Sequence, residues 1–413
     1  FSNDWMDEFK LRFSLGQTGN AASGASLYLG SYASGDNYMD MSAITPSTMQ
    51  LNRLKWETTT EYNTGLDASF LKGKLRFTVD VYQKYIKDLL QKKVKMPTSI
   101  GYGNGYEVSY MNSGKMTNKG WEFRVDAVPF ENRDWRVGFY FNIAHNENKI
   151  TEMPDNYTEE NYTFNNGEYA YRREEGRPMG SFYGYRYKGV CQNKDATYAR
   201  DADGNVMKDI SGNAIVMRNG TATIAPGDAL YEDINHDGVI NQYDIVYLGN
   251  SNPRFTGGAG VNVSYKQFKL SAIFYGRYGQ DVVNSTRLNN ESMRGIDNQS
   301  TAVLRRWRNE GDQTDIPRAL YGEGYNTLGS DRFVEDASYL RLKSLSFNYR
   351  LPKKIIQRWG FSNIDVYVTG YNLFTWTKYT GQDPEVKTEN TYARDSATTP
   401  ASIQLVAGFN LSF

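Results

Sequence analysis

The last eleven residues, Ile403-Gln-Leu-Val-Ala-Gly-Phe-Asn-Leu-Ser-Phe413, show most clearly how this chain folds. Every second residue is apolar, and this set consists of Ile403, Leu405, Ala407, Phe409, Leu411 and Phe413. The residues between them are polar or small, except Val406. Successive side chains of an extended chain point to opposite faces, so this stretch predicts a β-strand with one apolar and one polar face.

The same alternation recurs along the whole chain. It is found in nine further stretches: 10–16, 54–70, 75–89, 121–127, 135–143, 255–265, 268–276, 339–350 and 364–371. In one of them the apolar phase slips between Leu342 and Leu345, and such a slip predicts a β-bulge. The sequence therefore predicts ten strands, each with one apolar face.

The connections between these stretches are alternately very short and very long. Short turns occur at 72–74, 131–134, 266–267 and 352–354, and long connections cover about 17–52, 91–119, 150–252 and 282–335. A further alternating stretch, 182–190, is expected to form a hairpin within the connection at about 150–252. Outer-membrane barrels have this asymmetry, with short periplasmic turns and long extracellular loops.

The fold class predicted is therefore all-β: a transmembrane antiparallel β-barrel that crosses the outer membrane of a bacterial cell many times. Of the 413 residues 39% are hydrophobic and 14% aromatic, including 32 Tyr and 20 Phe. Aromatic belts at the two membrane interfaces explain this abundance of Tyr and Phe. No run of 18 apolar residues occurs, so no transmembrane helix is expected.

Several other classes of protein find no support. Lys and Arg total 47 and Asp and Glu total 47, with no basic run, so no nucleic-acid partner is expected. His145 and His236 lie in no nucleophile or zinc motif, so the chain is not expected to be an enzyme or to contain catalytic residues. The glycine-rich stretch 101–105 lacks the flanking strand and helix of a phosphate-binding loop, and no organic cofactor is expected.

Charged and amide side chains fall on the polar face of nearly every predicted strand. A small soluble barrel would fill its interior with aliphatic side chains, so this pattern predicts a wide lumen that is hydrated or plugged. Ten strands are too few to close around a plug, and an open sheet would leave unpaired edges in lipid. Because Phe1 to Trp5 carry no export signal, we expect a piece of a longer protein that supplies the remaining barrel half and plug.

Seven collinear motifs identify a known family. They are Lys10-Leu-Arg-Phe-Ser-Leu-Gly-Gln-Thr-Gly-Asn20, Leu54-Lys-Trp-Glu-Thr-Thr59, Gly180-Ser-Phe-Tyr-Gly-Tyr185, Pro226-Gly-Asp228 with Asp233-Ile-Asn-His-Asp-Gly238, Gly249-Asn-Ser-Asn-Pro253, Ala337-Ser-Tyr-Leu-Arg-Leu-Lys343 and Thr369-Gly-Tyr-Asn-Leu-Phe374. In these the chain resembles the SusC/RagA-like TonB-dependent transporters over essentially its whole length.

The resemblance implies a barrel of about 22 strands with a plug in its lumen. It also implies a segment that contacts TonB and a SusD-like surface lipoprotein that closes over the barrel as a lid. Residues 1–413 would form the C-terminal part of that barrel, without the plug and the N-terminal strands. The implied function is uptake of oligosaccharide or peptide nutrients, with substrate-binding residues unknown.

One loop has the spacing of a calcium site. In the stretch 233–244, Asp233, Asn235 and Asp237 occupy loop positions 1, 3 and 5, Gly238 follows, and a backbone carbonyl (Val239) and a carboxylate (Asp244) complete the set. Alternating oxygen ligands around a glycine turn wrap a hard cation, so the spacing predicts Ca²⁺. The alternative is a turn rich in Asp and Asn that keeps its shape without metal.

The C-terminal strand resembles the signal that the barrel-assembly machinery reads. Phe409, Leu411 and Phe413 supply apolar residues at the last position and every second one before it. The alternative is an ordinary amphipathic strand of a barrel wall.

Three functions compete at this stage. The first is energised nutrient import, and the second is a structural or adhesive surface protein that uses a barrel only as an anchor in outer-membrane lipid. The third is a soluble dockerin-like module built on the Asp233 loop, which would need a second copy of that loop with helices.

Overall fold

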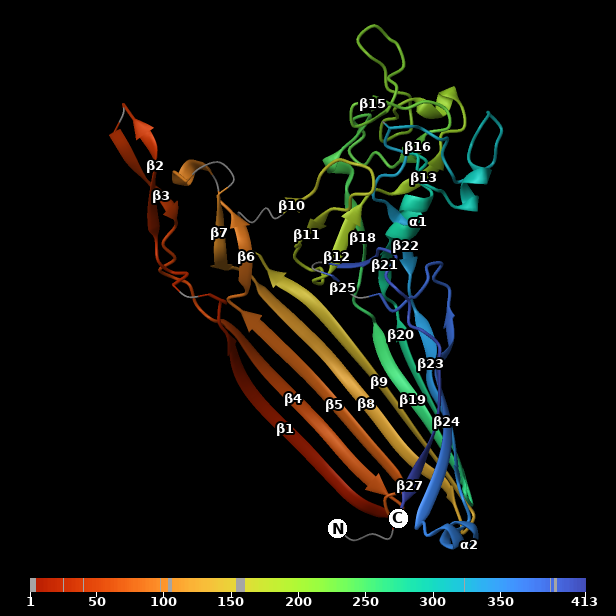
Figure 1. The fold of residues 1–413 in the computed structure, drawn as a ribbon. Coiled ribbons are helices and arrows are strands. Elements are labelled where there is room, and N and C mark those ends of the chain that lie inside the picture. Colours follow the sequence, from red (N-terminus) through yellow and green to blue (C-terminus); the bar gives the residue numbers. More distant parts are fainter. Residues whose placement is uncertain are drawn as a thin grey trace.

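The computed structural model describes residues 5–24, 26–39, 41–96, 98–102, 106–153, 160–322, 324–386, 388–389 and 392–413. Its main element is one ten-stranded antiparallel sheet in which neighbours in space are also neighbours among the sheet strands along the chain (Figure 1). The strands are β1 (Met6–Asn20), β4 (Glu57–Phe70), β5 (Leu75–Lys87), β8 (Lys115–Glu131), β9 (Trp135–Glu152), β19 (Phe255–Tyr265), β20 (Phe268–Tyr278), β23 (Tyr339–Arg350), β24 (Asn363–Thr377) and β27 (Gln404–Ser412).

All ten predicted strands are confirmed, and four of them, β1, β8, β9 and β24, extend well beyond the predicted stretches. β8 begins at Lys115 and β9 ends at Glu152, beyond the stretches 121–127 and 135–143. The added residues carry polar side chains on both faces, so the apolar alternation that marks a strand is lost there although the backbone pairing continues. The predicted bulge is confirmed as well, because Lys343 has no partner between Leu342 and Ser344 in the pairing with β20.

Short turns and long connections lie at opposite ends of the sheet, as predicted (Figure 1). The turn between β4 and β5 runs through Leu71, Lys72 and Gly73, all with positive φ, which closes a tight hairpin. The turn between β23 and β24 holds the short helix α2 (Lys353–Ile356). No helix in the described part of the chain is long and apolar enough to cross a membrane.

The apolar face of the sheet is bare. Phe13, Leu405 and Phe409 are 77%, 76% and 68% exposed, and Phe139 is exposed too. Where the structure describes the chain, three clusters of buried apolar residues occur, and they lie in the long connections and not in the sheet. A continuous exposed apolar face of this size requires an apolar surrounding, and lipid supplies it.

The connections 153–254, 279–338 and 378–403 pack together above the sheet, and we call their described residues the outer cap (Figure 1). Its remaining elements are short: β10 (Glu160–Asn161), β11 (Tyr171–Arg172), β12 (Ser181–Gly184), β13 (Tyr187–Val190), β14 (Arg218–Asn219), β15 (Ala222–Thr223), β16 (Ala229–Tyr231), β17 (Val239–Ile240), β18 (Val246–Asn250), β21 (Asp281–Asn284), β22 (Val334–Asp336), β25 (Thr388–Glu389), β26 (Tyr392–Asp395) and helix α1 (Ser285–Asn290).

The hairpin predicted for 182–190 is wrong. β12 pairs with β18, and β13 pairs with β16, so the two halves of this stretch bind different partners instead of each other. Between them Tyr185 is fully buried, and its backbone N–H donates to the carbonyl of Gly329. The chain therefore runs through the cap core without reversing.

Two hairpins stand on the first two long connections: β2 (Ser31–Tyr38) with β3 (Met41–Thr48), and β6 (Leu90–Lys95) with β7 (Glu107–Asn112). The sequence predicted only loops there, because these strands lack a continuous apolar alternation. They extend beyond the loop end of the sheet (Figure 1).

Candidate functional site

The polar face of the sheet carries charges that are paired across strands. Arg12 on β1 lies 2.7 Å from Asp67 on β4 and 3.0 Å from Asp80 on β5, so one guanidinium bridges three strands. A Cβ at Gly65 would come within 2.6 Å of that guanidinium, so glycine leaves the room it needs. Further along β5 and β4, Lys84 pairs with Glu61. A face lined in this way is suited to water, not to an aliphatic core.

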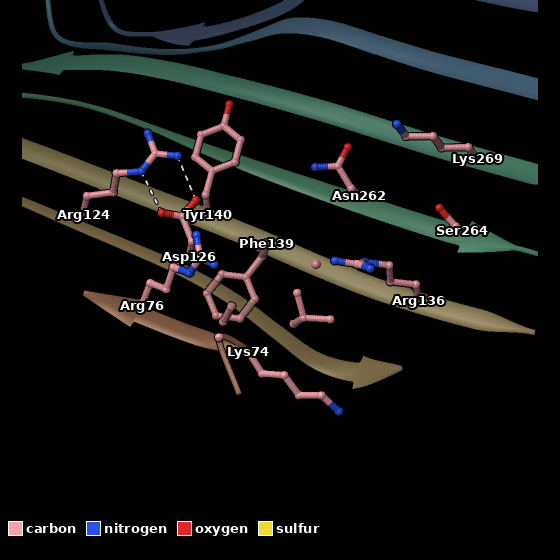
Figure 2. A pocket seen from close by; sticks show the side chains of 14 residues that line it. Lys74, Arg76, Arg124, Asp126, Arg136, Phe139, Tyr140, Asn262, Ser264 and Lys269 are labelled. Carbon is pink, nitrogen blue, oxygen red and sulfur yellow. Dashed lines mark hydrogen bonds and ion pairs between the residues drawn. The ribbon is translucent and has the colours of Figure 1, made fainter. Parts of the chain in front are cut away.

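A basic hollow of about 660 Å³ lies on this polar face at the turn end (Figure 2). Asp126 is the one carboxylate among its lining residues. Five cationic side chains line it as well: Lys74, Arg76, Arg124, Arg136 and Lys269. Arg124 holds Asp126 through two hydrogen bonds of 2.7 and 2.8 Å, and Arg136 lies 2.9 Å from Glu131. The excess of positive charge makes the hollow attractive to anionic groups.

Sequence reasoning missed this hollow. Its cations lie within a few residues of the predicted short turns, but on different hairpins. Pairing brings them together, since Arg76 lies opposite Asp126 and Arg136 lies opposite Ser264. The sequence does contain a signal for this hollow, because a basic residue recurs on the polar face beside each short turn.

A buried polar cluster joins two connections of the outer cap. Asp228 is 5% exposed and accepts hydrogen bonds of 2.7 and 3.1 Å from the guanidinium of Arg318. Its Oδ1 also accepts a bond from the amide of Asn326 at 3.2 Å. Buried carboxylates need such partners, so this cluster fixes the connection after β20 against the connection after β9.

The tyrosines of the long loops mostly pack the cap. Tyr183 and Tyr185 are fully buried, and Tyr169 is 5% exposed. Burial raises the pKa of Tyr185, and it raises the pKa of Tyr162, which hydrogen-bonds to it, to about 12. These hydroxyls are therefore structural parts of the core.

The 233–244 loop is a tight turn closed by its own side chains. The Gly238 N–H donates to Asp233 at 2.8 Å, and the Val239 N–H donates to Asp237 at 2.7 Å. Asn235 accepts from the Asp237 N–H at 3.2 Å. Gly238 has φ +79°, as its place in the turn requires. The predicted side-chain ligands at positions 1, 3 and 5 thus line a single turn.

Asp244 completes the loop from the far end. It is fully buried, and its two oxygens accept the backbone N–H groups of Ile234 at 2.9 Å and Asn241 at 2.8 Å. Burial, and then the charges of Asp233 and Asp237, raise its pKa. Among the described residues no ion pair reaches these carboxylates, and no group of three acidic, His or Cys side chains has the arrangement of a metal site. The Val239 carbonyl accepts a bond from the Asn241 side chain.

The predicted assembly residues lie at the turn end of the sheet. Phe409 and Leu411 are on the exposed apolar face of β27, whose one partner among the described residues is β24. Phe413 follows the strand, and its ring lies 5.0 Å from that of Phe361.

Comparison with known proteins agrees with this geometry. The model of the family described as TonB dependent receptor-like, beta-barrel matches residues 1–373. TonB-dependent receptor P3 of Formosa agariphila is 31% identical over 397 residues, which cover 92% of this chain and 36% of that protein. TonB-dependent receptor SusC of Bacteroides thetaiotaomicron is 27% identical over 99% of this chain and 38% of its own length.

Solved structures give the same answer. The RagAB peptide importer in its open-open state matches all of this chain and 41% of its own, with a TM-score of 0.76 and 25% identity. A second RagAB structure matches with a TM-score of 0.72 and 26% identity. This chain spans less than half the length of each relative it matches. It belongs to the TonB-dependent receptor-like β-barrel family of bacterial outer-membrane proteins, and it is of the SusC/RagA type.

Proposed function

We propose that this chain forms the C-terminal wall and the outer loops of an energised importer. The remaining strands and a plug would complete the barrel, a SusD-like lipoprotein would cover the outer cap, and TonB would drive release of the nutrient. An oligosaccharide or a peptide too large for porins would be the cargo. The related RagAB protein is a peptide importer.

One observation carries the proposal: the polar face carries charges that are ion-paired across strands, while both edge strands of the described sheet lack a second neighbour. In the described residues β1 pairs only with β4, and β27 only with β24. Unpaired edges cannot persist in hydrocarbon, because each unmet backbone group costs several kcal/mol. Further strands would therefore extend this wall around a wide aqueous lumen, as import of a large nutrient requires.

Uptake by cells carrying the full-length protein tests the proposal. Oligosaccharide and peptide nutrients would each be supplied as sole carbon source, with deletion of the TonB-contacting segment as the comparison. We expect growth on one nutrient class to depend on that segment while the barrel stays in the membrane. A barrel that is present but makes no difference to growth, and instead mediates adhesion, would support the anchor function.

We also propose that the 233–244 loop holds Ca²⁺ as a structural ion of the outer cap. Oxygen ligands suit this hard cation, and Asp233, Asn235 and Asp237 line one turn. The buried carboxylate of Asp244, close to two further carboxylates, also favours a cation on electrostatic grounds. The ligands would be the four side chains and the Val239 carbonyl.

Titration calorimetry on the full-length protein tests this second proposal. Asp237→Asn keeps an oxygen that can accept the Val239 N–H but removes a charge, so it separates metal binding from turn formation. Asp209→Asn is the matched control, because Asp209 closes a similar turn by accepting from Ser211 and Asn213. We expect a measurable heat of Ca²⁺ binding in the wild type and in the control, and a marked loss of this heat in Asp237→Asn. If the wild type shows no heat of Ca²⁺ binding, the loop is a turn closed by its own side chains and the metal proposal is wrong.

A further inference from the structure

A second hollow lies on the opposite, apolar face of the sheet, near the loop end. It has a volume of about 650 Å³, and its floor is the cross-strand pair Gly257 on β19 and Gly276 on β20. These glycines have no side chain to fill the wall, whereas every flanking position on this face carries a larger one. Towards the loops the next pair is Phe255 with Tyr278, and towards the turns it is Ala259 with Phe274.

Large apolar side chains wall this groove on its remaining sides. Leu340 on β23 lies beside Gly276, and Trp376 on β24 lies beside Leu340. The Trp376 ring stacks on that of Phe274 with centroids 6.4 Å apart, and the rings of Phe255 and Tyr278 stack at 6.5 Å. Trp376 and Leu340 are 52% and 48% exposed, so these walls face outward.

The rim of the groove at the loop end is polar. Lys378 is exposed there, and in the described part of the chain it forms no ion pair. Asp336 also borders the groove, but its carboxylate is turned to Ser338 and accepts that residue's backbone N–H at 2.8 Å. A free ammonium above an apolar trough matches a phosphate above an acyl chain.

We propose that this groove binds one acyl chain of an outer-leaflet lipid whose anionic headgroup lies at Lys378. The groove is continuous with the lipid-facing surface of an outer-membrane wall, so hydrocarbon and not water surrounds it. A second barrel would present a convex wall that cannot enter a trough, while a flexible chain can. The lipid is therefore a specific ligand that exchanges more slowly than its neighbours, and this does not depend on what the protein transports.

Filling the groove tests the proposal. Ala259→Phe adds a ring on the lipid face beside Phe274, and Ala272→Phe adds the same ring on the same face of β20 outside the groove. The full-length protein would be extracted from outer membranes in mild detergent, and retained lipid would be counted by native mass spectrometry. We expect one lipid per wild-type and Ala272→Phe molecule and at least a tenfold loss in Ala259→Phe.

Equal retention by Ala259→Phe, or retention of detergent alone by the wild type, would overturn the proposal. A wild-type dimer that separates in Ala259→Phe without any change in lipid would assign the groove to a second copy and overturn it too.

Two measurements do not rely on assembly of the filled variant. Lys378→Glu should lower retention of anionic phosphatidylglycerol severalfold and leave zwitterionic phosphatidylethanolamine unchanged. On the wild-type protein, phosphatidylglycerol with a diazirine in its acyl chain should cross-link to peptides containing Phe274 or Trp376. Cross-links spread evenly over the apolar face, or no effect of Lys378→Glu, would contradict the specific site.

Discussion

At the scale of single residues, Asp244 is a carboxylate in an unusual environment. It is fully buried, accepts two backbone N–H groups, and faces the charges of Asp233 and Asp237. Burial is the main cause that raises its pKa, so the folded loop favours the neutral carboxyl more than the unfolded chain does. Its contribution to stability is therefore present at low pH and is lost as the pH rises through the raised pKa.

Hydrogen exchange at the Ile234 and Asn241 amides should reveal this loss. With cations chelated, we expect both amides to be less protected at neutral pH than below pH 3.8, the ordinary pKa of an Asp carboxyl, after correction for intrinsic exchange rates. Ca²⁺ should restore protection at the higher pH, because a cation offsets the carboxylate charge. Asp244→Asn should remove the pH dependence. If the protection of both amides does not change with pH or with Ca²⁺, neither the charge of Asp244 nor a bound metal stabilises the loop.

Phe413 tests a second assignment at this scale. Deleting it should lower outer-membrane abundance severalfold if the terminal aromatic residue is read during assembly. Because its ring also packs on Phe361 at 5.0 Å, Phe361→Ala is the control that removes the packing and keeps the terminus. Surface labelling of intact cells measures both variants. Equal losses would show that packing, and not recognition, explains the effect.

At the scale of strands, bulky side chains on the polar face are seated over glycines of the next strand. An added Cβ would lie 2.1 to 2.6 Å from the ring or hydroxyl of a tyrosine at Gly120, Gly260 and Gly408, which face Tyr82, Tyr140 and Tyr367. An aromatic ring covering a glycine restores the packing that the missing side chain gives up.

Gly260→Ala should therefore destabilise the barrel by about 1–3 kcal/mol, since Tyr140 must leave its rotamer or the strands must separate. Gly16→Ala is the matched control, because it lies on the same face of β1 with no atom within 4 Å of the added Cβ. Urea unfolding in detergent, followed by the heat-dependent gel shift, measures both. Adding Tyr140→Ala to Gly260→Ala should recover part of the loss, and equal effects of the two alanines would contradict the steric account.

The strands of the ten-stranded sheet could be predicted because one face is suited to lipid and the other to water. These two surroundings require apolar and polar side chains to alternate strictly along each strand. Strand prediction placed a bulge between Leu342 and Leu345 for the same reason, since one extra residue shifts every later side chain to the other face, and the structure has this bulge at Lys343. It failed at 182–190, where residues 182–185 are buried in the protein core on both faces. There alternation identifies a strand but not its partner, and burial of Tyr185 decided the path.

The candidate sites also differ in how far they could be predicted from the sequence. The loop at 233–244 is local, so spacing alone places Asp233, Asn235 and Asp237 on one turn. The basic hollow and the apolar groove each combine several strands, and their residues meet only through pairing register. Register depends on turns and bulges, which a single sequence indicates less directly than it indicates a strand.

At the scale of the whole molecule, the cap and the wall are stabilised by different means. The cap contains the three buried apolar clusters of the described residues, whereas the wall is held by backbone pairing and exposes an apolar face suited to lipid. The two parts should therefore unfold separately: denaturant should act on the water-exposed cap before it opens the wall.

Arg318 offers a way to loosen the cap alone. Its guanidinium binds both oxygens of buried Asp228, so Arg318→Leu would leave that carboxylate without its cationic partner. We expect the free energy of unfolding of the cap to fall by about 3 kcal/mol, the lower end for breaking a buried ion pair, because Arg318 is partly exposed. Arg318→Lys keeps the charge without the two-pronged contact and should cost less. Proteinase K, which does not depend on basic residues, should cut Arg318→Leu within the cap and leave its heat-dependent gel shift unchanged. Loss of the gel shift at the same protease dose would mean that the wall needs the cap, and that the molecule unfolds as one unit.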